Sequence, residues 1–245
     1  GIPASELVSV ATNAHVITDF HRAQDARDEE IGTTKRGNGP AYRDKYDRRG
    51  MRALEEPRLS KYLVNLYEEL YENEEFEEIE ILFEGAQGFG LDIDWGDYPY
   101  VTSSHCTVGS ALLNGVPAKA IRDVWGVAKI YETYVGGKDF EGIDEEFDLI
   151  REIGEEYGST TGRPRQINWL DFDLLKMAAR INGVNKLVIN KMDVLEEVDK
   201  WRAYNGPHVL EFKSRRDMEF WISTKLQVEV DDDIETFFSG DKEKI

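Results

Sequence analysis

The sequence predicts an α/β fold, with helices on the faces of a largely parallel central sheet, and three observations lead to that prediction. Two short apolar segments, residues 79–83 and 186–190, end at polar or glycine-containing turns, as buried strands do. Segments in which apolar residues recur at helical spacing alternate with them, most clearly residues 172–181. Strands and helices that alternate along a chain are typical of a parallel sheet covered by helices.

The elements can be placed in order along the chain. Residues 6–30 have helical spacing in part, and residues 32–39 are a glycine-punctuated loop that Pro40 closes. The remaining predictions are an amphipathic helix over residues 59–71, an acidic stretch over 72–80, the strand over 79–83, a short helix over 109–115, a strand region over 124–134, the helix over 172–181 and the strand over 186–190. No internal repeat or low-complexity linker is present, and a chain of 245 residues can bury a core as one domain or as one domain with subdomains.

Composition and charge exclude several classes of protein. Apolar residues make up 40% of the chain and aromatic residues 11%, which is typical of globular proteins. No apolar run approaches the roughly 18 residues of a membrane span, and no signal-peptide pattern is present, so no membrane partner is expected. The single cysteine, Cys106, gives neither an internal disulfide nor a zinc-ligand spacing, which favours a reducing, cytosolic setting. A formal net charge of −19 argues against nucleic acid as a partner, because binding to its phosphates depends on Lys and Arg.

One segment departs from this acidic composition. Residues 33–52 contain seven basic and two acidic residues, which suggests a pocket for a small anion. The glycines of the preceding loop would let backbone amides approach a phosphate, and Thr33 and Thr34 add hydroxyl donors. The alternative is a charged surface loop. The phosphate-binding pattern Gly-x-x-x-x-Gly-Lys-Ser/Thr is absent from the sequence, so this loop is not a P-loop.

The sharpest local signal follows the apolar strand predicted at residues 186–190, where the chain reads Asn190, Lys191, Met192, Asp193. Ligands of open α/β sheets bind beyond the carboxyl ends of the strands. A carboxylate there can accept hydrogen bonds from the ring N–H and the exocyclic amine of guanine, a donor pair that adenine lacks. The stem of Lys191 can lie across the purine while its ammonium stays in water. The alternative is that the Asn and Asp side chains cap the next helix.

Two other segments carry groups that could bind a ligand. Small residues and two arginines form a loop that could hold a carboxylate or phosphate, or could be a solvated turn: Ser159, Thr160, Thr161, Gly162, Arg163, Pro164 and Arg165. After the strand predicted at residues 79–83, glycines bracket Gln87, whose amide could both donate to and accept from a purine edge. Asp92 and Asp94 follow, but two carboxylates without further ligands favour a structural role over a metal site.

Taken together, these segments resemble the adenylosuccinate synthetase family in order and spacing. The resemblance runs from residue 1 to about residue 193 and rests on the blocks at residues 32–42, 48–50, 84–88, 92–94, 98–104, 160–163, 169–171 and 190–193. It implies the P-loop-NTPase-like ligase fold of that family, without a P-loop. It also implies one domain of that type over residues 1–245, lacking its N-terminal portion, with residues 226–245 as an acidic, poorly matching tail.

The resemblance implies a GTP-dependent ligase that joins IMP and L-aspartate to adenylosuccinate, with release of GDP and phosphate. This is the first committed step of AMP synthesis from IMP. GTP would phosphorylate the 6-oxygen of IMP, and the amine of aspartate would then displace that phosphate. The family further implies Mg²⁺ as cofactor, a cytoplasmic location and a homodimer.

The family's binding residues can be carried over by motif. The residues that match IMP contacts are Thr34, Arg48, Gln87, Thr102, Val135 (through its backbone) and Arg163, with Arg48 donated across the homodimer interface. Residues 159–165 resemble the loop that closes on aspartate. The residues that match the GTP site are Arg165, Lys191, Met192 and Asp193, with Ser223, Thr224 and Lys225 as its distal wall.

Several departures from the family pattern bear on activity. The family's first glycine-rich loop, which holds the catalytic Asp and the Mg²⁺ contacts, and its catalytic His are not in this sequence. None of the four histidines matches that His: His15, His21, His105 and His208. An N-terminal truncation that leaves this chain inactive, with no catalytic residue and no metal ligand of its own, is therefore expected. Tyr134 stands where the family usually has Arg, and Lys225 replaces a glycine.

Two alternatives stay open. The short C-terminal region resembles archaeal and phage forms, and phage relatives use dGMP in place of IMP to make 2-aminoadenylosuccinate. A non-catalytic guanine-nucleotide-binding relative is the second alternative. A regulatory GTPase is disfavoured, because no P-loop is present to partner Asp193.

Overall fold

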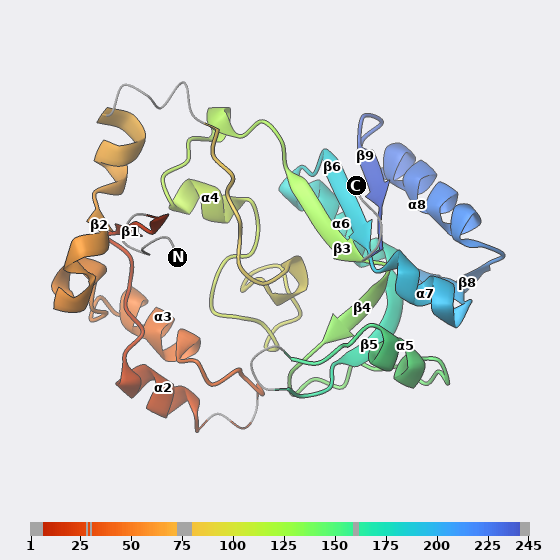
Figure 1. The fold of residues 1–245 in the computed structure, drawn as a ribbon, viewed down its shortest axis with the longest axis horizontal. Helices are drawn as coiled ribbons and strands as arrows, with labels where there is room; N and C mark the ends of the chain where they lie inside the picture. The colour runs from red at the N-terminus through yellow and green to blue at the C-terminus, as the bar shows by residue number, and fades with distance from the viewer. Residues whose placement is uncertain (1–6, 28, 30, 73–79, 159–161, 241–245) are drawn as a thin grey trace. The chain divides into compact units, whose positions relative to one another are not determined.

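The chain forms two compact units, Gly1–Pro117 and Ala118–Ile245 (Figure 1). The computed structural model describes residues 7–27, 29, 31–72, 80–158 and 162–240. Within those residues the strands are distributed over three sheets of two, three and four strands.

The first unit consists mainly of loops and short helices. Its two short strands, β1 (Val10–Ala11) and β2 (Leu63–Val64), pair in parallel. Its α-helices are α2 (Asp19–Asp25), α3 (Asn38–Tyr46) and α4 (Gly109–Leu113). The described part of the unit also contains three 3-10 helices, η1 (Ala53–Glu55), η2 (Pro57–Tyr62) and η5 (Phe89–Leu91), and one π-helix, η3 (Glu68–Glu72).

Helix α2 holds the glycine-punctuated loop in place. The buried carboxylate of Asp25, at the end of α2, accepts hydrogen bonds from the Gly37 backbone N–H at 2.7 Å and from the Thr33 hydroxyl at 2.9 Å. At the other end of the helix, Thr18 and His21 cap one another, and His21 Nε2 lies 3.2 Å from an Asp44 carboxylate oxygen on α3. The two helices and the loop between them therefore form one hydrogen-bonded substructure.

The second unit contains two sheets. One is parallel, in the order β3 (Trp125–Lys129), β6 (Lys186–Asn190), β9 (Glu235–Phe238). The other, in the order β4 (Tyr131–Tyr134), β5 (Gln166–Asp171), β7 (Trp201–Asn205), β8 (His208–Phe212), combines a parallel pair at its centre with an antiparallel pair on each side. The helices of the unit are η6 (Ala118–Ala120), α5 (Phe147–Ile153), α6 (Phe172–Asn182), α7 (Met192–Val198) and α8 (Arg215–Glu229).

One apolar core holds the second unit together. Helix α8 turns a single face inward, because Met218, Ile222 and Leu226 recur every four residues and are fully buried. On α6 the same role falls to Phe172, whose ring meets that of Trp221 on α8 with 4.9 Å between centroids. Each fully buried side chain of this size stabilises the fold by about 1.5–3 kcal/mol.

The predicted fold class is confirmed: parallel sheets flanked by helices occur, although they are small and separate. The helix predicted at residues 172–181 is α6, the strand at 186–190 is β6, and the short helix at 109–115 is α4. The strand region at residues 124–134 is two strands, β3 and β4, which belong to different sheets.

Three predictions of secondary structure were wrong in whole or in part. The helix expected over residues 59–71 is replaced by a 3-10 helix, the strand β2 and a π-helical turn, because the chain is extended at Leu63 and Val64. Among the described residues of the segment 6–30, only Asp19–Asp25 is an α-helix of more than one turn. Residues 80–83 form no strand, and Leu82 is 88% exposed, because no described strand pairs with them. Residue 79 and most of the acidic stretch at 72–80 lie outside the described residues.

Membrane insertion finds no support in the helices. None of those in the described part of the chain combines the length and the apolar composition that crossing a bilayer requires.

Gly183 ends α6 in a left-handed conformation, with φ 63° and ψ 42°. Nothing lies within 4 Å of the place where a side-chain Cβ would stand, so a substitution there meets backbone strain and no steric clash. We expect Gly183→Ala to lower the free energy of unfolding by about 1 kcal/mol, measured by urea denaturation. Gly183→Asn should lose less, because Asn enters this conformation more readily. An alanine variant as stable as the wild type would contradict this assignment.

Glu132 on β4 is a half-buried residue, and the pKa of its carboxyl group is raised to about 7, first by the loss of contact with water and then by the charge of Asp171. Because the pKa is higher in the folded than in the unfolded chain, this group stabilises the fold below pH 4.5 and loses that contribution as the pH rises through about 7. The loss corresponds to at most about 3 kcal/mol. Glu132→Gln should therefore flatten the fall in unfolding free energy between pH 5 and 8, and equal slopes in both proteins would refute the prediction.

Candidate functional site

The first candidate group lies where β6 passes into α7. Asn190 is the last residue of β6, and Lys191 adopts a left-handed conformation, with φ 64°, that turns the chain sharply into the helix. Lys191 itself occupies the N-cap position, and no side chain caps the helix there. The alternative in which Asn190 and Asp193 act as helix caps is therefore wrong, and their side chains are available for another purpose.

Two side-chain oxygens at this turn are buried and accept no hydrogen bond from any described residue: Oδ1 of Asn190 and Oδ1 of Asp193. Most buried polar atoms in folded proteins have a hydrogen-bond partner, and an unpaired one costs about 1–3 kcal/mol. Two such acceptors three residues apart indicate a place where the donors of a ligand would complete the hydrogen bonding.

The segment after β9 forms one wall of this turn. Ser239, which is buried, donates its backbone N–H to the Ile189 carbonyl at 2.9 Å and accepts from the Met192 N–H at 3.1 Å. A Cβ at Gly240 would stand 2.7 Å from Cβ of Asp193, so only glycine leaves room there for the Asp193 side chain. The sequence analysis missed Ser239 and Gly240, because residues 226–245 were expected to be an acidic tail. A Ser-Gly pair directly after an apolar segment was the available signal.

Beside this turn lies a cluster of charged groups around the buried carboxylate of Glu156. Both carboxylate oxygens lie 2.7 Å from Nζ of Lys129, the last residue of β3. The hydroxyl of Tyr131 donates to Glu156 at 2.8 Å, and the guanidinium of Arg165 donates at 3.1 Å. Burial lowers the pKa of Lys129 despite the nearby carboxylate, and burial together with the Glu156 charge raises the pKa of Tyr131. Of these four residues, only Arg165 was a predicted site residue.

Arg165 lies at the end of the loop expected to contact aspartate. Ser159, Thr160 and Thr161 lie outside the described residues. The rest of the loop is closed at its base: Tyr157 and Pro164 form an antiparallel bridge, and the Arg165 N–H donates to the Glu156 carbonyl at 2.9 Å. Within the loop, Gly158 donates to the Arg163 carbonyl at 2.8 Å, and Gly162 has φ 63°.

The proposed distal wall of the GTP site lies on α8. The hydroxyl of Ser223 is 2.6 Å from that of Thr236 on β9, Thr224 is exposed, and Lys225 forms an ion pair with Glu229 at 2.6 Å. The described residue that lies against Asp193 in these contacts is Gly240, which follows β9.

The predicted IMP contacts are divided between the two units. In the first unit, the structure brings Gln87 and Thr102 together, because the Ser104 hydroxyl lies 3.5 Å from a side-chain oxygen of each. Thr34 is exposed on the loop that Asp25 anchors, and Arg48 is exposed after α3, with φ 62°. Val135 and Arg163 belong to the second unit.

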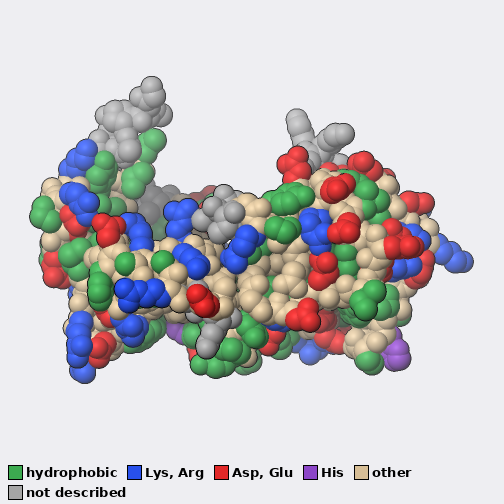
Figure 2. Space-filling model, turned by 90° about the horizontal axis from the view of Figure 1, so that it is seen from below, with side chains coloured by type: hydrophobic (Ala, Val, Ile, Leu, Met, Phe, Trp, Pro, Cys, Tyr) green, Lys and Arg blue, Asp and Glu red, His purple; other side chains and the backbone are tan. Residues whose placement is uncertain are grey.

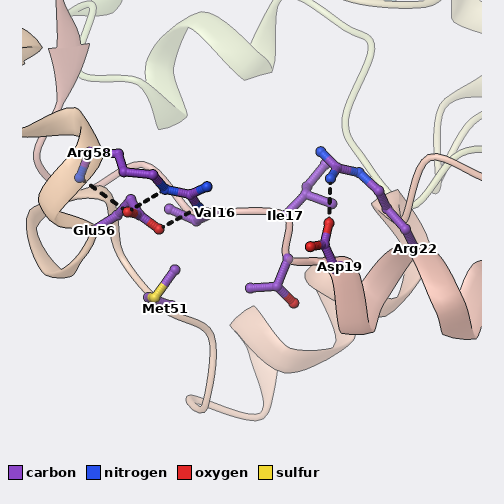
Figure 3. Close-up of a pocket in the computed structure, with 8 residues that line it drawn as sticks. Val16, Ile17, Asp19, Arg22, Met51, Glu56 and Arg58 are labelled. Carbon is purple, nitrogen blue, oxygen red and sulfur yellow. Dashed lines mark hydrogen bonds and ion pairs between the residues drawn. The ribbon is translucent and has the colours of Figure 1, made fainter.

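Basic side chains are frequent on the drawn face of the first unit, at the left of Figure 2, in agreement with the basic composition of residues 33–52. A pocket of about 270 Å³ also lies in this unit, and it contains both charges (Figure 3). Arg22 pairs with Asp19 at 2.8 Å, and Arg58 pairs with Glu56 at 2.8 Å, a hydrogen bond that lowers the pKa of Glu56 to about 2. Because each arginine already has a carboxylate, we assign no ligand to this pocket. Its remaining lining residues are Val16, Ile17, Thr18 and Met51.

A cluster of possible metal ligands in the first unit consists of Asp92, Asp94 and His105. Asp92 is fully buried, and its carboxylate accepts backbone N–H groups from Asp94 at 2.9 Å, from Trp95 at 3.1 Å and from Cys106. Burial opposes ionisation, but these hydrogen bonds outweigh it and lower the pKa of Asp92. Its lone pairs are thus used to hold the loop, as expected for a structural role, and the group does not fit a magnesium site.

The chain is similar to known proteins over most of its length. The model of the adenylosuccinate synthetase family matches residues 1–75 and 55–205. The adenylosuccinate synthetase of Carboxydothermus hydrogenoformans is 39% identical over 268 residues, which cover 86% of this chain and 62% of that relative. The enzyme of Aquifex aeolicus is also 39% identical, over 82% of this chain and 57% of that relative. The chain thus spans about three fifths of the length of the curated relatives that it matches.

Solved structures give the same picture. The structure of fully ligated adenylosuccinate synthetase from Plasmodium falciparum has a TM-score of 0.76 at 30% identity, and the match covers 87% of this chain and 63% of that one. A cyanophage S-2L succinoaminodeoxyadenylate synthetase bound to dGMP and dATP has a TM-score of 0.62 over 88% of this chain and 72% of that one. At 22% identity, that likeness concerns the fold alone. On the family model and these relatives, the chain belongs to the adenylosuccinate synthetase family.

Proposed function

We propose that this chain supplies binding residues for the GTP-dependent ligation of IMP and L-aspartate to adenylosuccinate, the reaction of its family, and that it recognises the guanine of GTP through Asp193. The observation that carries the proposal is the buried, unpaired Oδ1 of Asp193 beyond the carboxyl end of β6. The order of the remaining site residues along the sequence supports the same reading.

Guanine fits the unpaired acceptors better than adenine does. Its ring N–H and exocyclic amine are two parallel donors, which match the two oxygens of one carboxylate. Adenine presents an acceptor at the ring position and would leave Asp193 desolvated without a partner. Bidentate contacts of this kind discriminate between bases by about 1–3 kcal/mol. Gly240 supports the assignment, because the absence of a side chain there leaves the carboxylate its space.

In the proposed reaction, the γ-phosphoryl group of GTP moves to the 6-oxygen of IMP, and GDP leaves. The amine of aspartate then attacks carbon 6, and phosphate departs with its oxygen. Such transfers depend on fixed positive groups that stabilise charge on the phosphoryl oxygens. We propose that Arg165 and Lys191 serve GTP, while Thr34, Gln87, Thr102, Val135 and Arg163 contact IMP and residues 159–165 contact aspartate.

Three further features belong to the proposal: a cytoplasmic location, a homodimer in which Arg48 reaches the IMP of the partner subunit, and Mg²⁺. Bound Mg²⁺ would neutralise charge on the phosphates. We assign none of the described residues to it. Asp92, the buried member of the group of possible metal ligands described above, already accepts hydrogen bonds from backbone N–H groups.

The guanine assignment can be tested with Asp193→Ala. We expect GDP to bind about 10- to 100-fold more weakly to this variant, because two hydrogen bonds to guanine are lost, while IMP binding should change little. Isothermal titration calorimetry with each nucleotide measures both affinities. Glu197→Ala, on an exposed residue of the same helix, is the matched control and should bind GDP as the wild type does. Equal losses for GDP and IMP in Asp193→Ala would refute the assignment.

The dimer assignment can be tested with Arg48→Ala. Loss of a guanidinium contact to the IMP phosphate should weaken IMP binding by at least about 10-fold, while Arg49→Ala, on the neighbouring residue, should bind IMP normally. If Arg48 serves the partner's site, mixing Arg48→Ala and Arg163→Ala subunits should restore one intact site in each mixed dimer. Since equimolar mixing makes about half of the dimers mixed, calorimetry would then show tight binding at about a quarter of the normal stoichiometry. Absence of this recovery, in dimers verified by sedimentation, would exclude a shared site.

A further inference from the structure

We propose that Glu156 is a positioning residue for the nucleotide site, which fixes the side chain of Arg165 in the orientation that binds the guanine nucleotide. This inference rests on the proposed function and extends it to a residue that no sequence motif indicated. The observations that support it are the burial of Glu156, its contacts with three side chains and its place at the base of the loop of residues 157–164.

Glu156 cannot contact a ligand itself. Its side chain is only 3% exposed, and its carboxylate accepts from Lys129, Tyr131 and Arg165. The side chain of Arg165 is 29% exposed, so its guanidinium lies between the buried carboxylate and solvent. The carboxylate of Glu156 is shielded from solvent, so it can influence a ligand only through the partly exposed guanidinium of Arg165.

The backbone ties Glu156 and Arg165 together a second time. The Arg165 N–H donates to the Glu156 carbonyl at 2.9 Å, and the Glu156 N–H donates to the Arg151 carbonyl at 2.9 Å. The Arg151 side chain in turn donates to the Arg165 carbonyl at 2.8 Å. The main chain on both sides of Arg165 is therefore fixed, and the hydrogen bond to Glu156 removes the freedom that the long side chain would otherwise keep. Ordering such a side chain beforehand lowers the entropy lost on binding.

The second cation in the cluster, Lys129, lies against the buried carboxylate of Glu156 and offsets its charge. Lys129 directs hydrogen bonds to both oxygens of Glu156 and a third to the Thr133 hydroxyl at 3.2 Å. With Arg165, these contacts leave one net positive charge beside the turn at Asp193. That charge is of the sign that a nucleotide requires, and the side chains of both cations are partly exposed.

A double-mutant cycle tests this inference. Full-length chains carrying Glu156→Gln, Arg165→Met or both are titrated with GDP and, separately, with IMP. We expect each single variant to bind GDP about 10-fold more weakly, as the loss of a hydrogen bond to a charged group predicts. The double variant should bind GDP no more weakly than Arg165→Met alone, because Glu156 acts through Arg165. Glu152→Gln, an exposed residue of the same stretch of chain, is the matched control.

Several outcomes would overturn the inference. The inference is wrong if Glu156→Gln binds GDP as the wild type does, or if the two losses add in full. It is also wrong if IMP binding falls by the same factor as GDP binding, which a general loss of structure would produce. If Glu156→Gln does not fold, Glu156→Gln with Lys129→Met removes one buried charge of each sign and leaves Arg165 without its carboxylate. This variant should also bind GDP about 10-fold more weakly than Lys129→Met alone, and equal affinities would refute the inference.

A wild-type chain that does not prefer GDP to ADP would instead refute the proposed function, and the inference with it.

Discussion

The site depends on the parallel pairing of β6 with β3 on one side and β9 on the other. In this register Lys129 lies opposite Asn190, and Ile189 lies opposite Phe238, so all three strands end at the same edge. Lys129, Asn190 and Ser239 thereby come together from positions 49 to 110 residues apart in the sequence (239 − 190 = 49; 239 − 129 = 110). Parallel strands whose ends coincide leave a crevice beyond their carboxyl termini, which is where α/β proteins bind their ligands.

Four carboxylates with buried oxygens, those of Asp25, Asp92, Glu156 and Asp193, differ in whether the described residues supply them with hydrogen-bond donors. Asp25 and Asp92 accept backbone N–H groups and hold loops, while Glu156 is saturated by side-chain donors. Asp193 has a buried oxygen with no partner among the described residues. The fold supplies hydrogen-bond donors to Asp25, Asp92 and Glu156. It supplies none of the described donors to the buried oxygen of Asp193, so this oxygen is the one that a ligand would satisfy.

The sequence predicted those features that depend on neighbours along the chain. The strand and turn at residues 186–193 were found because an apolar segment and its polar end are adjacent, and α6 was found from its periodicity. The strand expected at residues 79–83 was wrong for the described residues 80–83, because a strand forms only when another strand pairs with it and the sequence does not show which segments pair. Glu156, Ser239 and Gly240 were missed for the same reason. Apart from the hydrogen bond between Glu156 and Arg165, their roles arise from contacts with residues distant in sequence. The spacing of residues along the chain does not predict such contacts.

A net charge of −19 does not by itself disfavour the proposed nucleotide ligand, and the geometry of the second unit explains why. Charges exposed to water are screened within about 8 Å at physiological ionic strength, so most of the acidic surface contributes little at the site. Partly buried charges are screened much less. Lys129 and Arg165 are only 24% and 29% exposed, and they act at short range from fixed positions. The affinity for an anion is therefore decided by a few enclosed cations, and the overall charge of the chain is a poor guide to its ligand.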